Sequence, residues 1–176
     1  MECAGWTWKN CSKALQGIMI GKEGQPSVRM EVICPLDLWI WSFQFALPGA
    51  MNDFNILEVS NYFTRVLFGD FPPVSRTFTI FREVFNWFYY LMDGIYPNWK
   101  VFAKSISSAC DRRSKLYTSR QEGISKCIER GFSVLFRRFK LLFIASGFWS
   151  LEKMKWLATA CVCMHNMIVG IRGVSY

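Results

Sequence analysis

Histidine is nearly absent from this chain: only His165 occurs among 176 residues. Seven cysteines are present, but no two form a CxxC pair, and Cys161 and Cys163 form only CxC. Structural zinc sites combine four Cys and His ligands at characteristic spacings, so this pattern argues against a zinc finger. We interpret the thiols as reduced and mostly buried, as is usual in an intracellular protein.

Long uninterrupted apolar runs are also absent. The first twenty residues contain no continuous apolar segment of the kind found in a signal peptide. The longest apolar stretch, residues 156–171, includes His165 and Asn166. It is shorter than the roughly 20 residues that a membrane-spanning helix needs. We therefore expect a buried amphipathic helix there, and no membrane partner.

The composition is that of a folded protein. Hydrophobic residues make up 52% of the chain and aromatic residues 17%, so much of the core should be aromatic. The length fits one domain over residues 1–176. The net charge of +8 favours polyanions, either nucleic acid or an anionic membrane surface, although a basic soluble domain without such a partner has the same composition.

Apolar periodicity predicts an α/β fold. Alternation over residues 27–35 and 38–47, with a turn at Pro35 and Asp37, predicts a hairpin. Further expected elements are a strand at Glu2, a helix from Asn52 or Asp53 to Gly69, one or two strands over 76–92, a short helix over 98–107, an exposed loop over 108–120, and helices over 119–143 and 151–168. This order suggests a mixed sheet with helices on its faces.

Several carboxylates fall where an α/β sheet binds ligands. Asp93 ends a predicted strand, Glu2 lies near another strand end, and Glu129 flanks the apolar stripe of the long helix. Converging carboxylates could hold two divalent cations for phosphodiester cleavage. The residues alone leave other roles open: Asp93 as a turn residue, Asp53 as a helix N-cap, and Glu129 as half of a surface salt bridge with Arg130.

Basic side chains occur in two clusters that could neutralise DNA phosphates. These residues are Arg112, Arg113 and Lys115 in the first cluster, and Arg137, Arg138 and Lys140 in the second. A solvated helix face would have the same composition. Trp6 and Trp8 could stack on unpaired bases, but core packing is the preferred interpretation. No helix-turn-helix reader is visible.

Five segments, in order, resemble the nuclease domain of PIF/Harbinger transposases, in the plant and oomycete group of DDE superfamily endonucleases. They are "ECAGWTWKNCSKALQG", "RMEVICPLDLWIWSFQFALPGAMNDFNILEVS", "YYLMDGIYPNWKVFAKSIS", "RQEGISKCIERGFSVLFRRF" and "TACVCMHNMIV". The resemblance implies an α/β fold with a ribonuclease-H-like mixed sheet flanked by helices. It also implies N-terminal truncation, because the helical DNA-binding region that precedes this domain in the family is missing.

The resemblance further implies a catalytic triad that holds two Mg²⁺ or Mn²⁺ ions. Its first acid falls on Glu2, its second on Asp93 in "DGIYP", and its third on Glu129 in "IERGFSVL". Asp53 matches another recurrent family acid, with an accessory or structural role. The His165–Asn166 pair matches the "HN" of the family's last helix, and we expect it to pack and form hydrogen bonds.

Two departures from the family pattern weaken the expected activity. The first acid is Glu rather than Asp, and an extra methylene shifts a ligand enough to cost ~10²-fold in rate. Trp87–Phe88 stands where relatives have a smaller residue. The implied function is therefore a nuclear, transposase-derived DNA endonuclease of reduced or lost activity, aided by a separate Myb-like DNA-binding protein and needing no small-molecule cofactor. The alternative is a non-catalytic DNA-binding or protein-interaction remnant.

Overall fold

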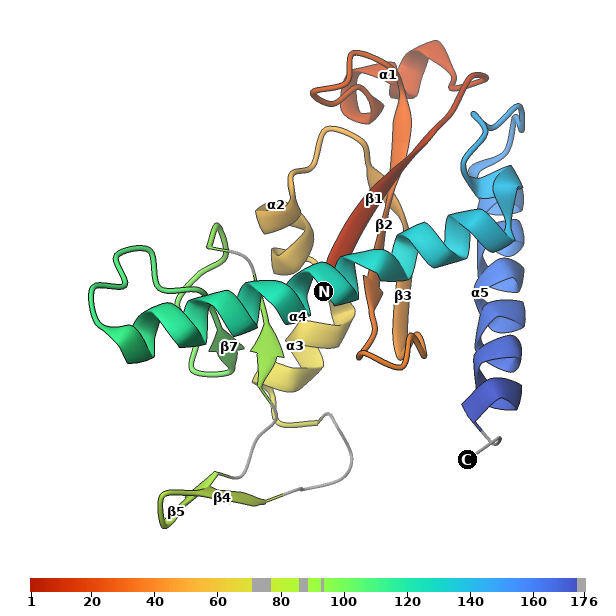
Figure 1. The fold of residues 1–176 in the computed structure, drawn as a ribbon. Helices are drawn as coiled ribbons and strands as arrows, with labels where there is room; N and C mark the ends of the chain where they lie inside the picture. Colours follow the sequence, from red (N-terminus) through yellow and green to blue (C-terminus); the bar gives the residue numbers. More distant parts are fainter. Residues whose placement is uncertain (71–76, 86–88, 93, 174–176) are drawn as a thin grey trace. The chain divides into compact units, whose positions relative to one another are not determined.

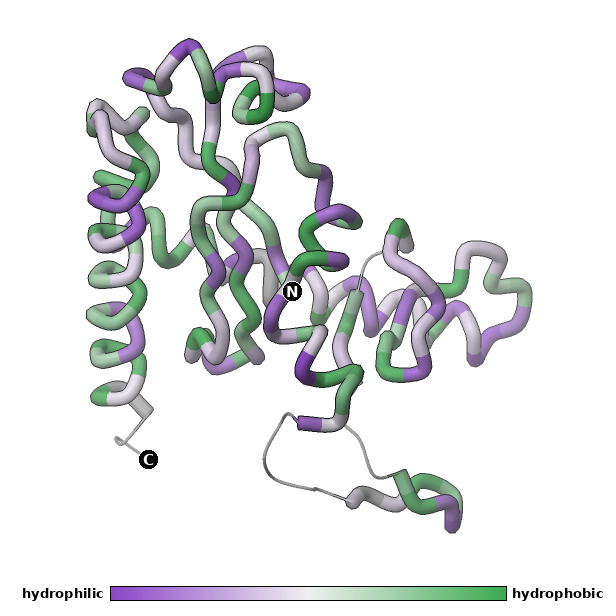
Figure 2. The backbone as a smooth tube through the Cα atoms, turned by 180° about the vertical axis from the view of Figure 1, so that it is seen from behind, coloured by the Kyte–Doolittle hydropathy of each residue, from purple (hydrophilic) through white to green (hydrophobic). Residues whose placement is uncertain are grey.

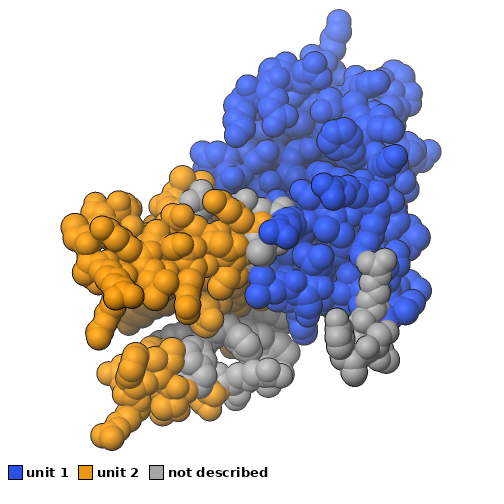
Figure 3. All heavy atoms as spheres, viewed as in Figure 1, with its two compact units in different colours: residues 1–56, 127–176 blue, residues 57–126 orange. Residues whose placement is uncertain are grey.

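A computed structural model describes residues 1–70, 77–85, 89–92 and 94–173. The chain divides into two compact units, residues 1–56 with 127–176, and residues 57–126 (Figure 3). The first unit contains β1 (Glu2–Thr7), α1 (Lys13–Met19), β2 (Ser27–Ile33), β3 (Ser42–Pro48), most of α2 (Asp53–Glu58), the second part of α4 (Arg112–Arg138), a 3-10 turn (Lys140–Leu142) and α5 (Leu151–Gly173). The second contains α3 (Asn61–Leu67), β4 (Phe78–Ile80), β5 (Glu83–Phe85), β6 (Tyr90–Leu91), β7 (Phe102–Ala103) and the start of α4.

An antiparallel sheet of three strands, in the order β1-β2-β3, forms the centre of the first unit (Figure 1). Glu2 pairs with Val32 and Trp6 with Val28, while Val32 also pairs with Phe43 of β3. The register shifts between Arg29 and Glu31, which marks a β-bulge. This register places Glu2 on the same sheet face as the buried valines of β2, because strand side chains alternate between faces.

The two sheet faces differ in chemistry. Val28, Met30 and Val32 are at most 1% exposed and belong to a core that also includes Phe132 of α4 and Met154 of α5. On the opposite face, β2 presents polar side chains, among them Arg29 and Glu31, near the start of α2. The hydrophobic core is therefore built on one face and a buried polar cluster on the other.

Tryptophan closes one end of the core in the first unit. Trp6 and Trp8 are each 2% exposed, and their indole nitrogens donate hydrogen bonds to the carbonyl oxygens of Ile144 (2.8 Å) and Phe148 (2.7 Å). The preferred interpretation of these tryptophans as core residues is confirmed. Because both rings are buried, neither is available to stack on bases in this structure.

Aromatic residues form the core of the second unit. Phe63, 1% exposed, contacts the rings of Tyr90 (5.2 Å between centroids) and Phe102 (5.4 Å) edge to face. The Tyr62 and Tyr90 hydroxyls lie 3.1 Å apart, and burial raises the pKa of Tyr90 well above its usual range. β6 and β7 pair in parallel. Gln121 of α4 donates hydrogen bonds to the carbonyl oxygens of Met92, which follows β6, and Ala103, the last residue of β7.

The predicted hairpin, long helix and last helix are confirmed. The fold is a mixture of α and β with a three-stranded antiparallel sheet. Three expectations about secondary structure were wrong. The short helix over 98–107 is absent, because Phe102 instead joins a parallel strand pair. The loop over 108–120 is helical from Arg112, because Asp111 accepts hydrogen bonds from the backbone nitrogens of Arg113 and Ser114 and so caps α4.

The single helix expected up to Gly69 is two helices. Ser60 is fully buried, and its hydroxyl accepts a hydrogen bond from the backbone nitrogen of Phe63 (3.4 Å), which starts α3 after α2 has ended. Asn52 does cap α2 as expected, and Gly69 adopts a φ of 76° after α3. The expected single domain over residues 1–176 stays a prediction.

Candidate functional site

Glu2 and the second part of α4 meet on the core face of the sheet. Glu2 is the first residue of β1, and its Oε2 accepts a hydrogen bond from the backbone nitrogen of Phe132 (3.3 Å). Glu129 lies in α4, one turn before Phe132. The first and third acids of the expected triad therefore lie on elements that are packed together. The Glu129 side chain itself is outside the described part of the structure.

Glycine allows this approach between helix and sheet. A Cβ at Gly131 would lie 2.8 Å from Cys34 Sγ and 3.8 Å from Glu2 Oε2, so only glycine fits without displacing a neighbour. The apolar periodicity of α4 gave no sign of this contact. Gly131 is thus a positioning residue that sequence reasoning missed, and its only signal was a glycine inside an otherwise strong helix.

Asp93, the expected second acid, lies outside the described residues. The strand before it is present as β6, which ends at Leu91, and Met92 is buried. Among the described side chains, no group of three or more Asp, Glu, His or Cys residues could hold a metal ion. Since two of the three expected ligands fall outside that set, the triad of Glu2, Asp93 and Glu129 stays a prediction.

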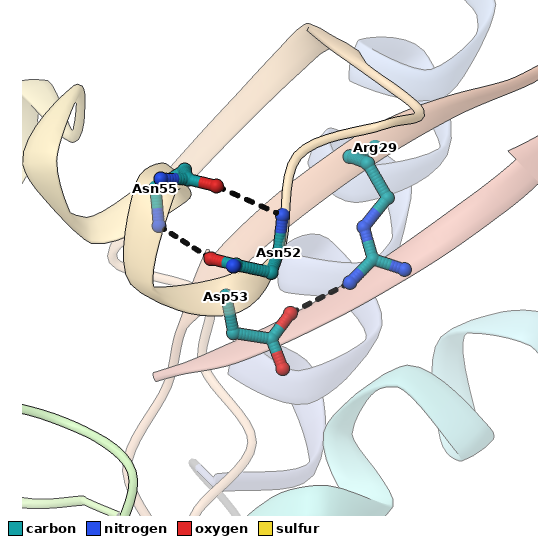
Figure 4. A network of polar contacts seen from close by, with 4 residues as sticks. All are labelled: Arg29, Asn52, Asp53 and Asn55. Atoms are coloured by element: carbon teal, nitrogen blue, oxygen red, sulfur yellow. Dashed lines mark hydrogen bonds and ion pairs between the residues drawn. The ribbon is translucent and has the colours of Figure 1, made fainter. Parts of the chain in front are cut away.

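Asp53, the expected accessory acid, forms an ion pair. Its Oδ1 lies 2.6 Å from Arg29 Nη2, and the Arg29 side chain is 12% exposed (Figure 4). Beside it, Asn52 Oδ1 accepts from the backbone nitrogen of Asn55 (2.8 Å), and Asn55 Oδ1 accepts from that of Asn52 (3.4 Å). This pairing favours the structural role for Asp53, as the anchor of α2 on the polar sheet face.

The polar cluster also suppresses the reactivity of a thiol. Burial, together with the nearby carboxylates of Asp53 and Glu31, raises the pKa of Cys3 to about 12, while Arg29 acts in the opposite direction. Burial likewise raises the pKa of Cys34 to about 11. A thiol that stays protonated is a poor nucleophile and a poor metal ligand. The six cysteines whose side chains are described are free, but only three of them are buried and two are exposed, so the expectation of mostly buried thiols holds for half of this set.

The two basic clusters differ in how available they are. Arg112, Arg113 and Lys115 are exposed in the first turn of α4, and Arg137 and Lys140 are exposed near its end. Arg138 is half-buried, and its Nη1 contacts His165 Nδ1 (3.2 Å). Five of the six expected DNA contacts are therefore open to solvent, whereas Arg138 is held inside the first unit.

His165 and Asn166 fasten α5 to the turn between β2 and β3. His165 Nε2 lies 2.9 Å from the carbonyl oxygen of Leu38, and Asn166 exchanges two hydrogen bonds of 2.9 Å with the backbone of Ile40. His165 is fully buried, and burial lowers its pKa. The expectation that this pair packs and forms hydrogen bonds is confirmed.

One comparison with known proteins gives a match. The family model described as plant transposon protein matches residues 1–174. No curated protein and no solved structure matches the chain.

Proposed function

Because the chain belongs to the plant transposon protein family, we propose that it is a transposase-derived, metal-dependent DNA endonuclease domain with a ribonuclease-H-like fold. The observation that carries the proposal is the hydrogen bond from the Phe132 backbone to Glu2, one helical turn from Glu129. It supports a shared site for two acids that are far apart in sequence. The β1-β2-β3 antiparallel order and the parallel β6-β7 pair are compatible with such a fold.

The donor chemistry suits hard cations. Glu2, Asp93 and Glu129 would supply only carboxylate oxygens, which Mg²⁺ and Mn²⁺ prefer. Two such ions, when bound, activate a water and stabilise the leaving 3′ oxygen. The hydrogen bond from Phe132 fixes one carboxylate oxygen of Glu2 and so limits where the other can point. Glu2, Asp93 and Glu129 would hold the ions, while Asp53 keeps its partner Arg29.

The exposed basic residues would hold the DNA. Arg112, Arg113, Lys115, Arg137 and Lys140 can each neutralise a phosphate without reading sequence. We expect sequence choice to come from a separate Myb-like protein and the site of action to be the nucleus. A DNA-binding remnant without catalysis is the second candidate, because these exposed basic residues could bind DNA without Glu2, Asp93 and Glu129.

Nicking of supercoiled plasmid in Mn²⁺ tests the first proposal. We expect nicking by the wild type, and its loss in Glu2→Gln, Asp93→Asn and Glu129→Gln. The matched control is Glu58→Gln, an exposed acid at the end of α2. Mn²⁺ binding, followed by electron paramagnetic resonance, should weaken in the three triad variants only. Equal nicking by wild type and triad variants would refute the endonuclease.

DNA retention distinguishes the remnant. If the chain only binds, retention should persist in EDTA and fall steeply with salt. Arg112→Ala with Arg113→Ala should then lower affinity and flatten the salt dependence. A chain that neither nicks plasmid nor retains DNA at low salt would remove both candidates.

A further inference from the structure

Helix α5 has two apolar faces. Its inner face, Met154, Ala158, Cys161, Val162 and His165, is buried in the core of the first unit. The outer face carries six exposed residues from position 156 on, after the exposed charged residues Glu152, Lys153 and Lys155; we call these six the outer seam: Trp156, Ala160, Cys163, Met164, Met167 and Ile171. Trp156 is 68% exposed, Met167 67% and Ile171 72%. Figure 2 shows hydrophobic residues recurring along the whole length of this helix. A helix that is apolar all round is normally covered on every side.

The spacing of the outer seam is that of a helix-pairing surface. Trp156, Ala160, Cys163 and Met167 follow each other at intervals of four, three and four residues, which is the heptad pattern of a coiled coil. Ile171 continues the seam one turn further. The pattern therefore fits a second helix lying along α5 rather than a compact ligand.

The seam is complementary to itself when two copies run antiparallel. With the two-fold axis between positions 163 and 164, Trp156 faces Ile171, Ala160 faces Met167 and Cys163 faces Met164. Each small side chain then meets a larger one, which is the arrangement that fills an interface without voids. A parallel pair would instead set Trp156 against Trp156 and Ala160 against Ala160.

We propose that the outer seam of α5 is a homodimer interface in which two copies of this chain pair their last helices antiparallel. Two such seams cover on the order of 1,000 Å² in total, the lower limit for a specific interface. Two-fold dimers are the commonest oligomers, and their interfaces are self-complementary. The proposal does not depend on the endonuclease activity.

A lipid bilayer is the other occupant that the helix could take. By length and composition the part of α5 from Leu151 to Ile171 is apolar enough to cross a membrane, and 28% of its apolar 18-residue window is buried in the protein. However, its inner face holds polar contacts, including the two hydrogen bonds between Asn166 and Ile40. Surrounding α5 with lipid would break them without replacement, which is costly. Pairing of outer seams leaves them intact.

Sedimentation velocity of the full chain over a range of concentrations tests the pairing. We expect a monomer–dimer equilibrium that Met167→Glu weakens at least tenfold, because a carboxylate is placed opposite Ala160 of the other copy. Ile18→Glu, at an exposed apolar position of α1, is the matched control and should not change the equilibrium. Far-ultraviolet circular dichroism verifies that each variant is folded. A monomer at all concentrations, or equal effects of both variants, would overturn the proposal.

Cysteine cross-linking tests the orientation. In a Cys110→Ser, Cys163→Ser background, Trp156→Cys and Ile171→Cys chains should cross-link to each other when mixed and oxidised. Cross-linking of Trp156→Cys to itself would indicate parallel pairing and overturn the antiparallel arrangement. Flotation of the wild type with phosphatidylcholine vesicles, lost in Met167→Glu, would show that lipid occupies the seam instead.

Discussion

Gly131 of α4 lies so close to Cys34 that a single added carbon would not fit between helix and sheet. A Cβ at Gly131 falls 2.8 Å from Cys34 Sγ, and Cys34 is itself buried. The short cysteine side chain is enclosed by the core and has little room to move. This contact sets the depth at which α4 sits, and with it the hydrogen bond from Phe132 to Glu2.

Gly131→Ala should therefore destabilise the protein by about 1–3 kcal/mol, the usual cost of overpacking. Urea denaturation measures the change in the free energy of unfolding. Gly123→Ala is the matched control, because it lies in the same helix and a Cβ added there would meet nothing within 4 Å. Removal of an exposed helical glycine there should stabilise by up to ~1 kcal/mol.

A compensating change separates local crowding from helix propensity. Adding Cys34→Ala to Gly131→Ala removes the atom that the new methyl group meets, so the pair should recover part of the lost stability. If Gly131→Ala proved as stabilising as Gly123→Ala, the tight contact would be refuted. The tight contact would also be refuted if the double variant lost as much free energy of unfolding as the two single variants lose together.

The Arg29–Asp53 pair gives a second prediction. Arg29 is 12% exposed, its Nη2 lies 2.6 Å from Asp53 Oδ1, and in the described structure its Nε atom has no hydrogen-bond partner. Asp53→Ala would leave a largely buried guanidinium without this partner. We expect a loss of about 1–3 kcal/mol, less than for a fully buried pair because Asp53 is 37% exposed.

Replacement of both partners distinguishes the ion pair from other roles. Arg29→Met with Asp53→Leu should be more stable than Asp53→Ala alone, since the largely buried guanidinium is removed together with its partner. Glu58→Ala, at the exposed end of α2, should change stability by less than ~0.5 kcal/mol. Were Asp53 instead a metal ligand, Asp53→Asn would abolish stabilisation by Mn²⁺ in thermal unfolding. We expect that stabilisation to survive.

The turn of the β4–β5 hairpin gives a third prediction. Phe81 and Arg82 have φ angles of 49° and 72°, in the left-handed region where glycine and asparagine are preferred. Phe81 is 98% exposed, so no packing within the described structure offsets this conformation. Arg82→Gly should stabilise the hairpin by about 1 kcal/mol and slow hydrogen exchange at the strand amides. Glu83→Gly, one residue further in β5, should speed that exchange instead.

Local alternation made part of the fold predictable. Val28, Met30 and Val32 alternate with Arg29 and Glu31, and such a pattern specifies a strand with one core face. The β2–β3 hairpin followed from this alternation, and the last two helices followed from apolar residues spaced three and four positions apart. Contacts between distant segments were not predictable, because the glycine at position 131 stands out within its helix but nothing in that segment indicates that Cys34 is its neighbour.

Short elements were also beyond the reach of sequence patterns. Phe102 and Ala103 form a two-residue strand that exists only through its partner β6. Asp111 is a good N-cap, but the polar, basic residues that follow it were interpreted as an exposed loop, so the start of α4 was not predicted. For the candidate site, Glu2 was found through the family resemblance, whereas the hydrogen bond that orients it required the fold.

The buried histidine makes stability depend on pH. His165 Nδ1 faces the Arg138 guanidinium at 3.2 Å and must accept a hydrogen bond from it, so Nε2–H donates to the Leu38 carbonyl oxygen and the ring is neutral. Burial lowers the pKa of His165 below its ordinary value of 6.5, and Arg138 lowers it further, while the hydrogen bond to Leu38 opposes both. Unfolding frees the ring to take up a proton more readily than it can in the folded protein.

The sign follows from proton uptake. Below the unfolded pKa of about 6.5 the unfolded chain binds more protons than the folded one, so the free energy of unfolding falls as the pH falls towards the folded pKa. One group contributes at most about 1.4 kcal/mol per pH unit. His165→Gln, which leaves the chain without histidine, should flatten the pH dependence of the urea-denaturation midpoint between about pH 5 and 7.

Arg138→Met should raise the pKa of His165, read from the NMR titration of its ring protons, because the facing positive charge is gone. An unchanged titration in Arg138→Met, or the same pH slope with and without His165, would contradict the neutral, Arg138-facing ring.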